Sequence, residues 1–297
     1  MIQSIYLGRI AYADALALQK ELVELRHQGR IENTLLLLEH PPVLTLGRSA
    51  NRSNILASDE ALARAGFTLH EINRGGDVTY HGPGQLVGYP IFDLRSLTNS
   101  TGGRLGPVDF VRRIEEALIR LTAHYGIETG RVQGRTGVWT IYKDISKDLP
   151  ESAYQENALH EIPQQEKKIG AIGVHVSRGI TSHGFAYNLS TDLRDFQWII
   201  PCGIADREVT SLELELASQN PRTTKLPSLS ELAASATRYF GEVFYPSLTP
   251  EQSVQSLPDG AAGLATLGVS IPTTGTPMRL PAAEEHLLST VTSIEHC

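Results

Sequence analysis

Short connections between strand-like segments limit most strongly how this chain can fold. The run from Lys168 to Ser177 is followed after two residues by the run from Ile180 to Leu189, and a pair of prolines separates Thr34 to Glu39 from Val43 to Leu46. A parallel crossover needs a dozen or more residues, so these connections do not fit strict alternation of strands and helices. Because proline cannot donate to a strand ladder, the proline pair also predicts a break between its two strands.

Helical periodicity marks three further segments. Apolar residues at spacings of three and four predict helices over residues 12–28 and 230–240, and a third helix whose stripe begins at Val111 and ends at Gly126. Further strands are predicted for residues 67–72, 85–94 and 137–143. The mixture predicts an α/β fold of the α+β kind, in which a mixed sheet is flanked by helices.

Composition suggests one catalytic domain with two additions. A chain of 297 residues that is 41% hydrophobic can bury one sizeable core, which we assign to residues 1–245. Residues 144–166 are polar and acidic with two prolines, and they predict a surface insertion. Residues 246–297 are rich in Ser, Thr, Pro, Gly and Ala, which predicts a loosely ordered C-terminal tail.

Charge and cysteine content exclude several classes of protein. The net charge of -7 comes without a basic stripe, so neither nucleic acid nor an anionic membrane is an expected partner. No apolar run approaches the roughly 20 residues of a membrane helix, and the N-terminus lacks the pattern of a signal peptide. Two cysteines, Cys202 and Cys297, are too few for a disulfide framework or a zinc site. A reduced, cytoplasmic location is therefore expected.

The first segment suited to chemistry is a glycine-rich run with a cation at its start and an imidazole near its end. Its members are Arg74, Gly75, Gly76, Asp77, Val78, Thr79, Tyr80 and His81, followed by Gly-Pro-Gly-Gln. Glycines let a backbone approach a ligand closely, Arg74 can anchor an anion or a carbonyl group, and His81 can exchange a proton. A glycine-rich turn with a solvent-facing arginine is an equally good interpretation of this run alone. The spacing matches neither a Walker loop nor a dinucleotide fingerprint.

Three later segments each combine a polar group with small residues. Lys168 precedes Gly170, Ala171, Ile172 and Gly173, which leave room beside a strand for an apolar chain. The second is His183, Gly184, Phe185 and Ala186, and the third is Cys202 between Pro201 and Gly203. Taken singly, a strand-edge lysine, a structural histidine and a buried cysteine are common. A tight turn next to positive charge is, however, the setting in which a thiol becomes nucleophilic.

Together the four segments resemble the lipoyl(octanoyl) transferases. The matching stretches are RGGDVTYHGPGQL, KIGAIGVHVSRGITSHGFAYNLSTDL and IPCGI, and EHPPVLTLGR also looks like an early strand pair of that family. The similarity covers roughly residues 5–243 apart from the insertion, and all four segments occur in the family's order.

The resemblance implies a fold, an activity and roles for individual residues. The fold is that of the biotin and lipoyl protein ligases. The implied catalytic residues are Cys202, which carries the acyl group as a thioester, Lys168, which lowers the pKa of that thiol, and His81, which can accept a proton. Substrate binding is implied for Arg74 to His81, for Ala171 to Gly173 and for Gly184 to Ala186.

The implied partners are an acyl donor and its protein acceptors. Octanoyl-acyl carrier protein is the donor, and lipoyl domains of 2-oxoacid dehydrogenase E2 subunits and the glycine cleavage H protein are the acceptors. No cofactor, ATP or metal is expected, because a thioester is already activated. A lipoate-protein ligase remains one alternative, although such enzymes do not use a cysteine at this position. A non-catalytic protein that binds acyl groups or lipoyl domains is the other.

Overall fold

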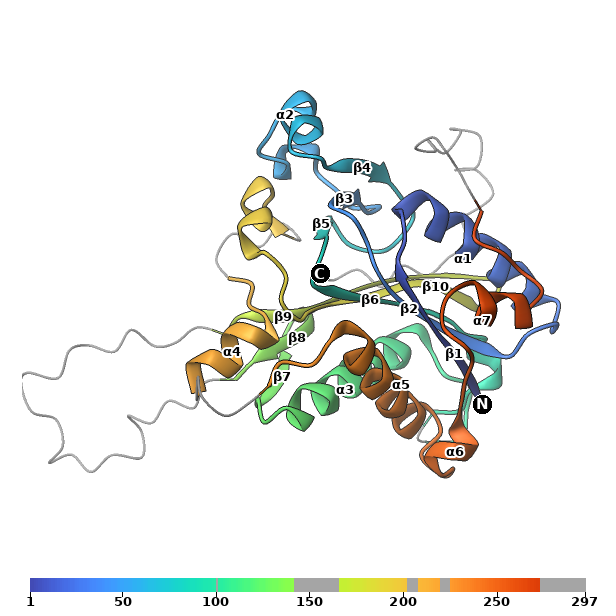
Figure 1. Cartoon of the computed structure of the whole chain (residues 1–297). Coiled ribbons are helices and arrows are strands. Elements are labelled where there is room, and N and C mark those ends of the chain that lie inside the picture. Colours follow the sequence, from blue (N-terminus) through green and yellow to red (C-terminus); the bar gives the residue numbers. More distant parts are fainter. Residues whose placement is uncertain (100, 142–165, 202–207, 220–224, 273–297) are drawn as a thin grey trace, which may run out of the picture.

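A large mixed sheet with helices on both faces forms the body of the protein (Figure 1). The computed structural model describes residues 1–99, 101–141, 166–201, 208–219 and 225–272. The predicted nucleophile Cys202 and the predicted insertion, apart from Glu166, lie outside these ranges.

The strands occur in two sheets. The large sheet contains, in spatial order, β11 (Val254–Ser256), β1 (Ile2–Arg9), β2 (Asn33–Glu39), β6 (Gln85–Ile91), β10 (Ile180–Asn188), β9 (Lys168–Ser177), β8 (Arg135–Thr140) and β7 (Thr129–Val132). The small sheet contains β4 (Thr68–Glu71), β3 (Val43–Leu46) and β5 (Val78–His81). Strand β1 pairs in parallel with β2 and β11, and the other neighbours in the large sheet are antiparallel. The predicted mixed sheet is confirmed.

Helices cover both faces of the large sheet, and the burial of β2 shows why. The helices are α1 (Tyr12–His27), α2 (Asp59–Arg64), α3 (Pro107–His124), α4 (Leu212–Gln219), α5 (Leu229–Phe244), α6 (Pro250–Ser253) and α7 (Ala261–Thr266). Leu35 and Leu37 pack with α3 and α5, whereas Leu36 and Leu38 pack with α1 and α7. Because side chains alternate along a strand, four consecutive leucines are buried only when both faces are covered.

The proline pair carries the chain from one sheet to the other. Strand β2 ends at Glu39 in the large sheet, and β3 begins at Val43 in the small one. The small sheet has its own apolar cluster, in which Phe67, Tyr80 and Phe196 meet. The predicted break at the prolines is confirmed, and the loop that leads into β5 rests on the middle of β9, where the N–H of Gly75 donates to the carbonyl of Val174.

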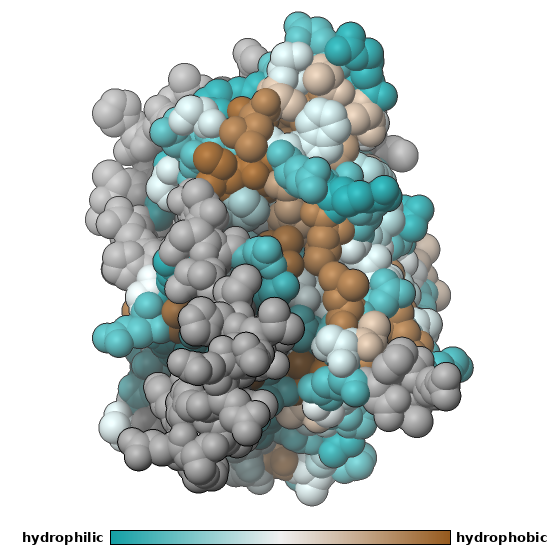
Figure 2. Space-filling model, turned by 90° about the vertical axis from the view of Figure 1, so that its left-hand side faces the viewer, coloured by the Kyte–Doolittle hydropathy of each residue, from teal (hydrophilic) through white to brown (hydrophobic). Residues whose placement is uncertain are grey.

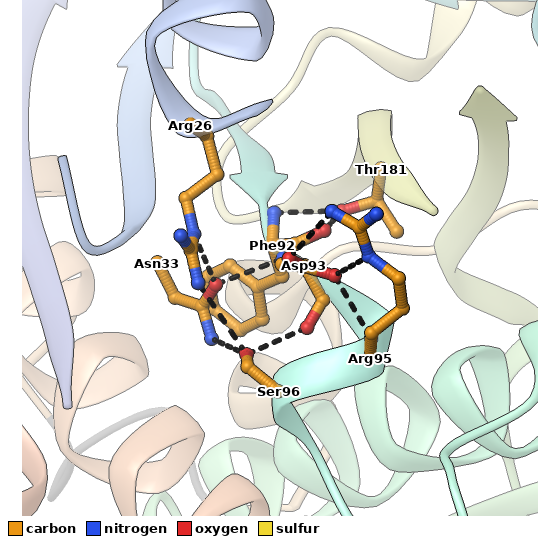
Figure 3. Close-up of polar contacts among 7 residues, drawn as sticks. All are labelled: Arg26, Asn33, Phe92, Asp93, Arg95, Ser96 and Thr181. Atoms are coloured by element: carbon orange, nitrogen blue, oxygen red, sulfur yellow. Dashed lines mark hydrogen bonds and ion pairs between the residues drawn. The ribbon is translucent and has the colours of Figure 1, made fainter. Parts of the chain in front are cut away.

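A polar cluster fixes β10 beside β6 (Figure 3). The hydroxyl of Thr181 accepts from the backbone N–H of Phe92 at 2.9 Å and donates to the carbonyl of Pro90 at 2.6 Å. The amide oxygen of Asn33 accepts from the backbone N–H of Asp93 at 2.8 Å and from Arg26 Nε at 2.9 Å. These bonds tie β2, α1 and β10 to the end of β6, and they hold the register that aligns Phe185 with Gly88.

The C-terminal segment corrects one expectation. Residues 246–272, predicted to begin a loose tail, form α6, β11 and α7. Strand β11 extends the large sheet beside β1, and Leu264 of α7 is fully buried against the α1 side of the sheet. Composition alone predicted a loose tail, because it does not show that a few well-placed apolar side chains suffice to pack an otherwise polar segment against the core. Residues 273–297 lie outside the described ranges.

Within the described ranges, no helix is both long enough and apolar enough to cross a bilayer.

Candidate active site

A pocket lies where α1, β5, β6, β9 and β10 meet. Its lining residues are Tyr12, Arg74, Thr79, His81, Tyr89, Ala171, Ile172, Gly173, His183, Gly184, Phe185 and Ala186. The structure therefore gathers residues from three of the segments that the sequence analysis selected. The pocket is narrow, with about 30 Å³ open to the centres of water molecules, which is room for one or two of them.

Small residues on two adjacent strands make one wall of the pocket. Ala171 of β9 lies opposite Ala186 of β10, and Gly173 lies opposite Gly184. A Cβ atom at Gly173 would lie 3.0 Å from the carbonyl oxygen of Gly75 and 3.1 Å from Arg74 Cδ. Glycine at position 173 thus lets the Arg74 loop rest directly on the strand.

The loop that carries Arg74 is fixed on both sides. The N–H of Gly75 donates to the carbonyl of Val174 on β9 at 3.1 Å, and the N–H of Arg48 donates to the carbonyl of Arg74 at 3.0 Å. The carboxylate of Asp77 accepts from the backbone N–H of Asn51 at 3.0 Å. Such bracing holds the backbone in a single arrangement beside the pocket.

Arg74 is a buried cation whose hydrogen bonds go to neutral acceptors. Its side chain donates to the carbonyls of Gly75 and Thr45 at 2.9 Å each, to the Thr45 hydroxyl at 3.0 Å and to the carbonyl of Asp77 at 2.8 Å. The residue is only 6% exposed, and its Nε has no partner within the described residues. A buried charge that is not neutralised by a carboxylate favours an anionic or strongly polar oxygen nearby.

Alternation along β5 divides its side chains between the pocket and the core. Thr79 and His81 line the pocket, whereas Val78 and Tyr80 are buried in the cluster of the small sheet. The Tyr80 hydroxyl donates to the carboxylate of Asp195 at 2.6 Å. The glycine-rich run therefore contributes two side chains of its strand to the site, and the other two anchor that strand.

The titratable groups of the pocket are neutral at physiological pH, with the exception of Arg74. Burial lowers the pKa of His81 to about 3 and that of His183 to about 3. Burial raises the pKa of Tyr12 and of Tyr89 above the usual range. Within the described lining, the arginine consequently supplies the only charge, surrounded by neutral donors and acceptors.

Lys168 lies at the start of β9, outside the pocket lining. It is 7% exposed, and its ammonium nitrogen lies 4.7 Å from the ring centroid of the fully buried Trp139. Its backbone N–H donates to the carbonyl of Glu208 at 2.9 Å, and its carbonyl accepts from the N–H of Thr210 at 2.9 Å. The chain that follows the Cys202 segment is thus hydrogen-bonded to Lys168.

The chain that leads into the Cys202 segment is also anchored to the site. The N–H of Ile200 donates to the carbonyl of Asn54 at 2.8 Å. The side chain of Asn54 in turn donates to the carboxylate of Asp77, in the loop that carries Arg74. Both ends of the undescribed segment 202–207 are therefore attached to elements that also hold the pocket.

Comparison with known proteins identifies the family. The profile of the lipoyl protein ligase A/B catalytic domain matches residues 11–231. The chain belongs to this family. The octanoyltransferase of Acidobacterium capsulatum is 59% identical over 82% of this chain and 90% of its own length. That of Koribacter versatilis is 50% identical over 82% of this chain and 84% of its own.

Solved structures agree on the fold. A bi-partite lipoate protein ligase from Thermoplasma acidophilum aligns with a TM-score of 0.56, at 14% identity, over 90% of each chain. The predicted ligase-like fold and the predicted acyltransferase activity are both confirmed for this member of the family. At 14% identity, the solved ligase informs the fold alone.

The predicted site residues divide into three groups. Nine lie together in the pocket: Arg74, Thr79, His81, Ala171, Ile172, Gly173, Gly184, Phe185 and Ala186. Gly75, Gly76, Asp77, Val78 and Tyr80 support that pocket from outside its lining. Lys168 lies outside it next to Trp139, and Cys202 lies outside the described residues.

The sequence patterns did not predict two of the residues that line the pocket. Tyr12 opens α1, and Tyr89 lies on β6, in segments where the pattern predicts only secondary structure. Both contact His40, whose Nε2 lies 2.7 Å from the Tyr89 hydroxyl and whose ring centroid lies 5.1 Å from that of Tyr12. His183, which the sequence left as a structural residue, also lines the pocket, and it has a positive φ of 56°. A strained backbone of this kind often marks a functional site.

Proposed function

We propose that the enzyme transfers an octanoyl group from octanoyl-acyl carrier protein to a lysine of a lipoyl domain, through a thioester on Cys202. The acceptors would be lipoyl domains of 2-oxoacid dehydrogenase E2 subunits and the glycine cleavage H protein. The reaction needs no ATP, metal or other cofactor, because the donor thioester is already activated. One observation carries the proposal. Three separate segments, represented by Arg74, Ala171–Gly173 and Gly184–Ala186, converge on one pocket in a chain whose relatives are octanoyltransferases.

The wall of small residues suits the acyl chain. Ala171 and Ala186 present methyl groups to the pocket, and Gly173 and Gly184 present only backbone. Burying a methylene group stabilises binding by about 0.8 kcal/mol, so the seven carbons beyond the carbonyl could contribute at most about 5 to 6 kcal/mol.

The first half-reaction is exchange between two thioesters. The Cys202 thiolate attacks the octanoyl carbonyl, and the bond to the sulfur of the carrier's prosthetic thiol breaks. The carrier leaves as a thiolate, which can take up the proton that the Cys202 thiol lost, and the enzyme holds the octanoyl thioester. Lys168, a buried cation whose strand is hydrogen-bonded to the chain after Cys202, favours the thiolate over the thiol. Arg74, which lines the pocket, can hold a polar oxygen of the substrate there.

The second half-reaction forms the stable product. The neutral amine of the lipoyl-domain lysine attacks the acyl-enzyme, an amide forms and the bond to Cys202 sulfur breaks. The amine gives up a proton and the departing thiolate can take one up, so no net proton is needed. The amide is more stable than the thioester, which makes this half-reaction favourable.

The enzyme meets two proteins in turn, and its surface is compatible with this. Figure 2 shows the side of the molecule where α4 lies, with apolar side chains running in a band between polar margins. Contiguous apolar surface is typical of protein-binding faces. A reducing, cytoplasmic setting belongs to the same proposal, because the mechanism requires a free thiol.

Intact mass spectrometry tests the proposal. The protein, mixed with octanoyl carrier protein alone, should gain one octanoyl group, and hydroxylamine should remove it. Adding an apo lipoyl domain should move that group to the domain without ATP or magnesium. Cys202→Ser should form no adduct, whereas Cys297→Ser should behave like the parent and so controls for general thiol loss. An absolute ATP requirement, or full activity of Cys202→Ser, would instead indicate a ligase.

A further inference from the structure

A buried relay of side-chain amides begins at the segment that follows the predicted nucleophile. The backbone carbonyl of Thr210 accepts a hydrogen bond from Asn188 Nδ2 at 2.9 Å. A carbonyl oxygen can only accept, so this contact requires the NH₂ group of Asn188 to face Thr210. The amide oxygen of Asn188 must then face the other way, toward Gln85.

The next amide in the relay has its orientation fixed twice. Gln85 Nε2 donates to Asn188 Oδ1 at 2.9 Å and also to the carbonyl of Tyr80 at 3.3 Å. Reversing this amide would place its oxygen against two other oxygens. Gln85 Oε1 therefore faces His81 Nδ1, at 2.8 Å. Because an amide oxygen only accepts, Nδ1 must carry the imidazole proton.

The opposite ring nitrogen of His81 is then left with a lone pair. None of the described residues forms a hydrogen bond with Nε2, and the imidazole lines the pocket. Burial lowers the pKa of His81 to about 3, so the ring stays neutral at physiological pH. A neutral imidazole with this tautomer can accept an N–H hydrogen bond at Nε2, but it cannot donate one to a carbonyl oxygen.

We propose that Gln85 and Asn188 are positioning residues that hold His81 in the Nδ1–H tautomer, so that Nε2 accepts a hydrogen bond from the acceptor lysine's amine. This assignment of the bonding partner rests on the proposed function. The attacking amine nitrogen has N–H bonds to donate, whereas the acyl carbonyl has none. His81 thus orients the amine, and its low proton affinity leaves the proton itself for a stronger base such as the departing thiolate.

The relay also explains why these two amides are buried. Gln85 is 1% exposed and Asn188 is 4% exposed, and both belong to central strands of the large sheet. A buried amide costs stability unless its polar groups are hydrogen-bonded, whereas an apolar residue at the same position would need no partners. The two buried amides therefore determine which ring nitrogen of His81 carries the proton.

Nitrogen-15 NMR of the ring nitrogens tests the tautomer directly. The resting enzyme is used without any substrate, and the His81 signals are assigned by their loss in His81→Asn. We expect the proton on Nδ1 in the parent enzyme. In Gln85→Met, which removes the acceptor, we expect the proton to move to Nε2 in most molecules. Gln19→Met, which replaces a glutamine of α1 that is also 1% exposed, is the control and should keep the parent tautomer.

Single-turnover kinetics tests the consequence. Gln85→Met should slow transfer from the acyl-enzyme to the lipoyl domain by about tenfold or more, the effect of losing one hydrogen bond, and should leave formation of the acyl-enzyme within about threefold. If Gln85→Met fails to fold, the tautomer of the parent enzyme, which requires no variant, still tests the inference.

Two results would overturn the inference: a parent enzyme protonated on Nε2, or a Gln85→Met variant that folds and retains the parent tautomer. Equal slowing of both half-reactions would show that the relay is merely structural. Because the NMR experiment involves neither substrate nor Cys202, its outcome is independent of the test of the thioester mechanism.

Discussion

Replacing Leu264 by alanine should destabilise the enzyme substantially, although this residue lies beyond the segment matched by the family profile. The Leu264 side chain is fully buried in α7 and packs in the cluster between α1 and the large sheet. Truncating a buried leucine costs about 2 to 5 kcal/mol, because burial is lost and a cavity remains. Alanine is at least as good a helix former as leucine, so the backbone of α7 adds no further cost.

The matched control is Leu248→Ala, in the same C-terminal segment but 40% exposed. Its effect should stay within about 0.5 kcal/mol. In a domain of this size, 1 kcal/mol shifts the melting temperature by about 2 to 4 °C, so Leu264→Ala should melt about 4 to 20 °C below the parent. Differential scanning fluorimetry and urea unfolding would measure the difference. A melting temperature equal to the parent's would show that α7 is only loosely attached, as composition alone suggested, and would refute the reasoning from burial.

Three other predictions concern the site. Lys168→Met should reduce octanoyl transfer severely and raise the titration midpoint of the Cys202 thiol. The circular dichroism spectrum should stay unchanged, because the backbone hydrogen bonds of β9 do not involve the side chain. Transfer at the parent rate would contradict the role assigned to Lys168. Gly173→Val should weaken octanoyl binding by about tenfold or more, because its Cβ would lie only 3.0 to 3.1 Å from atoms of the Arg74 loop. Gly179→Ala, at a turn outside the pocket, is the control, and in a binding titration it should retain the parent affinity even if the protein is less stable. The free energy of unfolding should fall as the pH is lowered from about 6.5 toward 4. Burial lowers the pKa of His81 from 6.5 to about 3, so in this pH range the unfolded chain binds more protons than the folded protein. Urea unfolding at several pH values would measure the dependence of this free energy on pH, which should be weaker in His81→Gln.

The sequence by itself determined most secondary structure and the segments of the site. The predicted bounds of β3 and β9 match the structure, and α1 begins at the predicted residue. These elements carry strong local signals: helical spacing, a proline break or a bounded run of β-branched residues. Glycine-rich runs also predicted where backbone would approach a ligand, as at Gly173, where a side chain would meet the Arg74 loop.

Other elements had no local signal and depended on tertiary contacts. Strand β5 lies inside the glycine-rich run, and it is a strand because its Val78 and Tyr80 side chains have a core to enter. Strand β11 has three residues and pairs only because β1 offers a free edge beside it. A short segment cannot bury enough surface by itself to specify its conformation, so composition underestimated the C-terminal region.

The chemistry of the site shows the same division. The sequence supplied the imidazole of His81, but its tautomer depends on Asn188, which bonds to Gln85 from 103 positions away, and on the Thr210 carbonyl beyond it. Likewise, residue type made Arg74 a cation, and only folding buried it among neutral acceptors. Local sequence fixes which groups are present, whereas burial and long-range hydrogen bonds decide their charge, their tautomer and the direction in which they act.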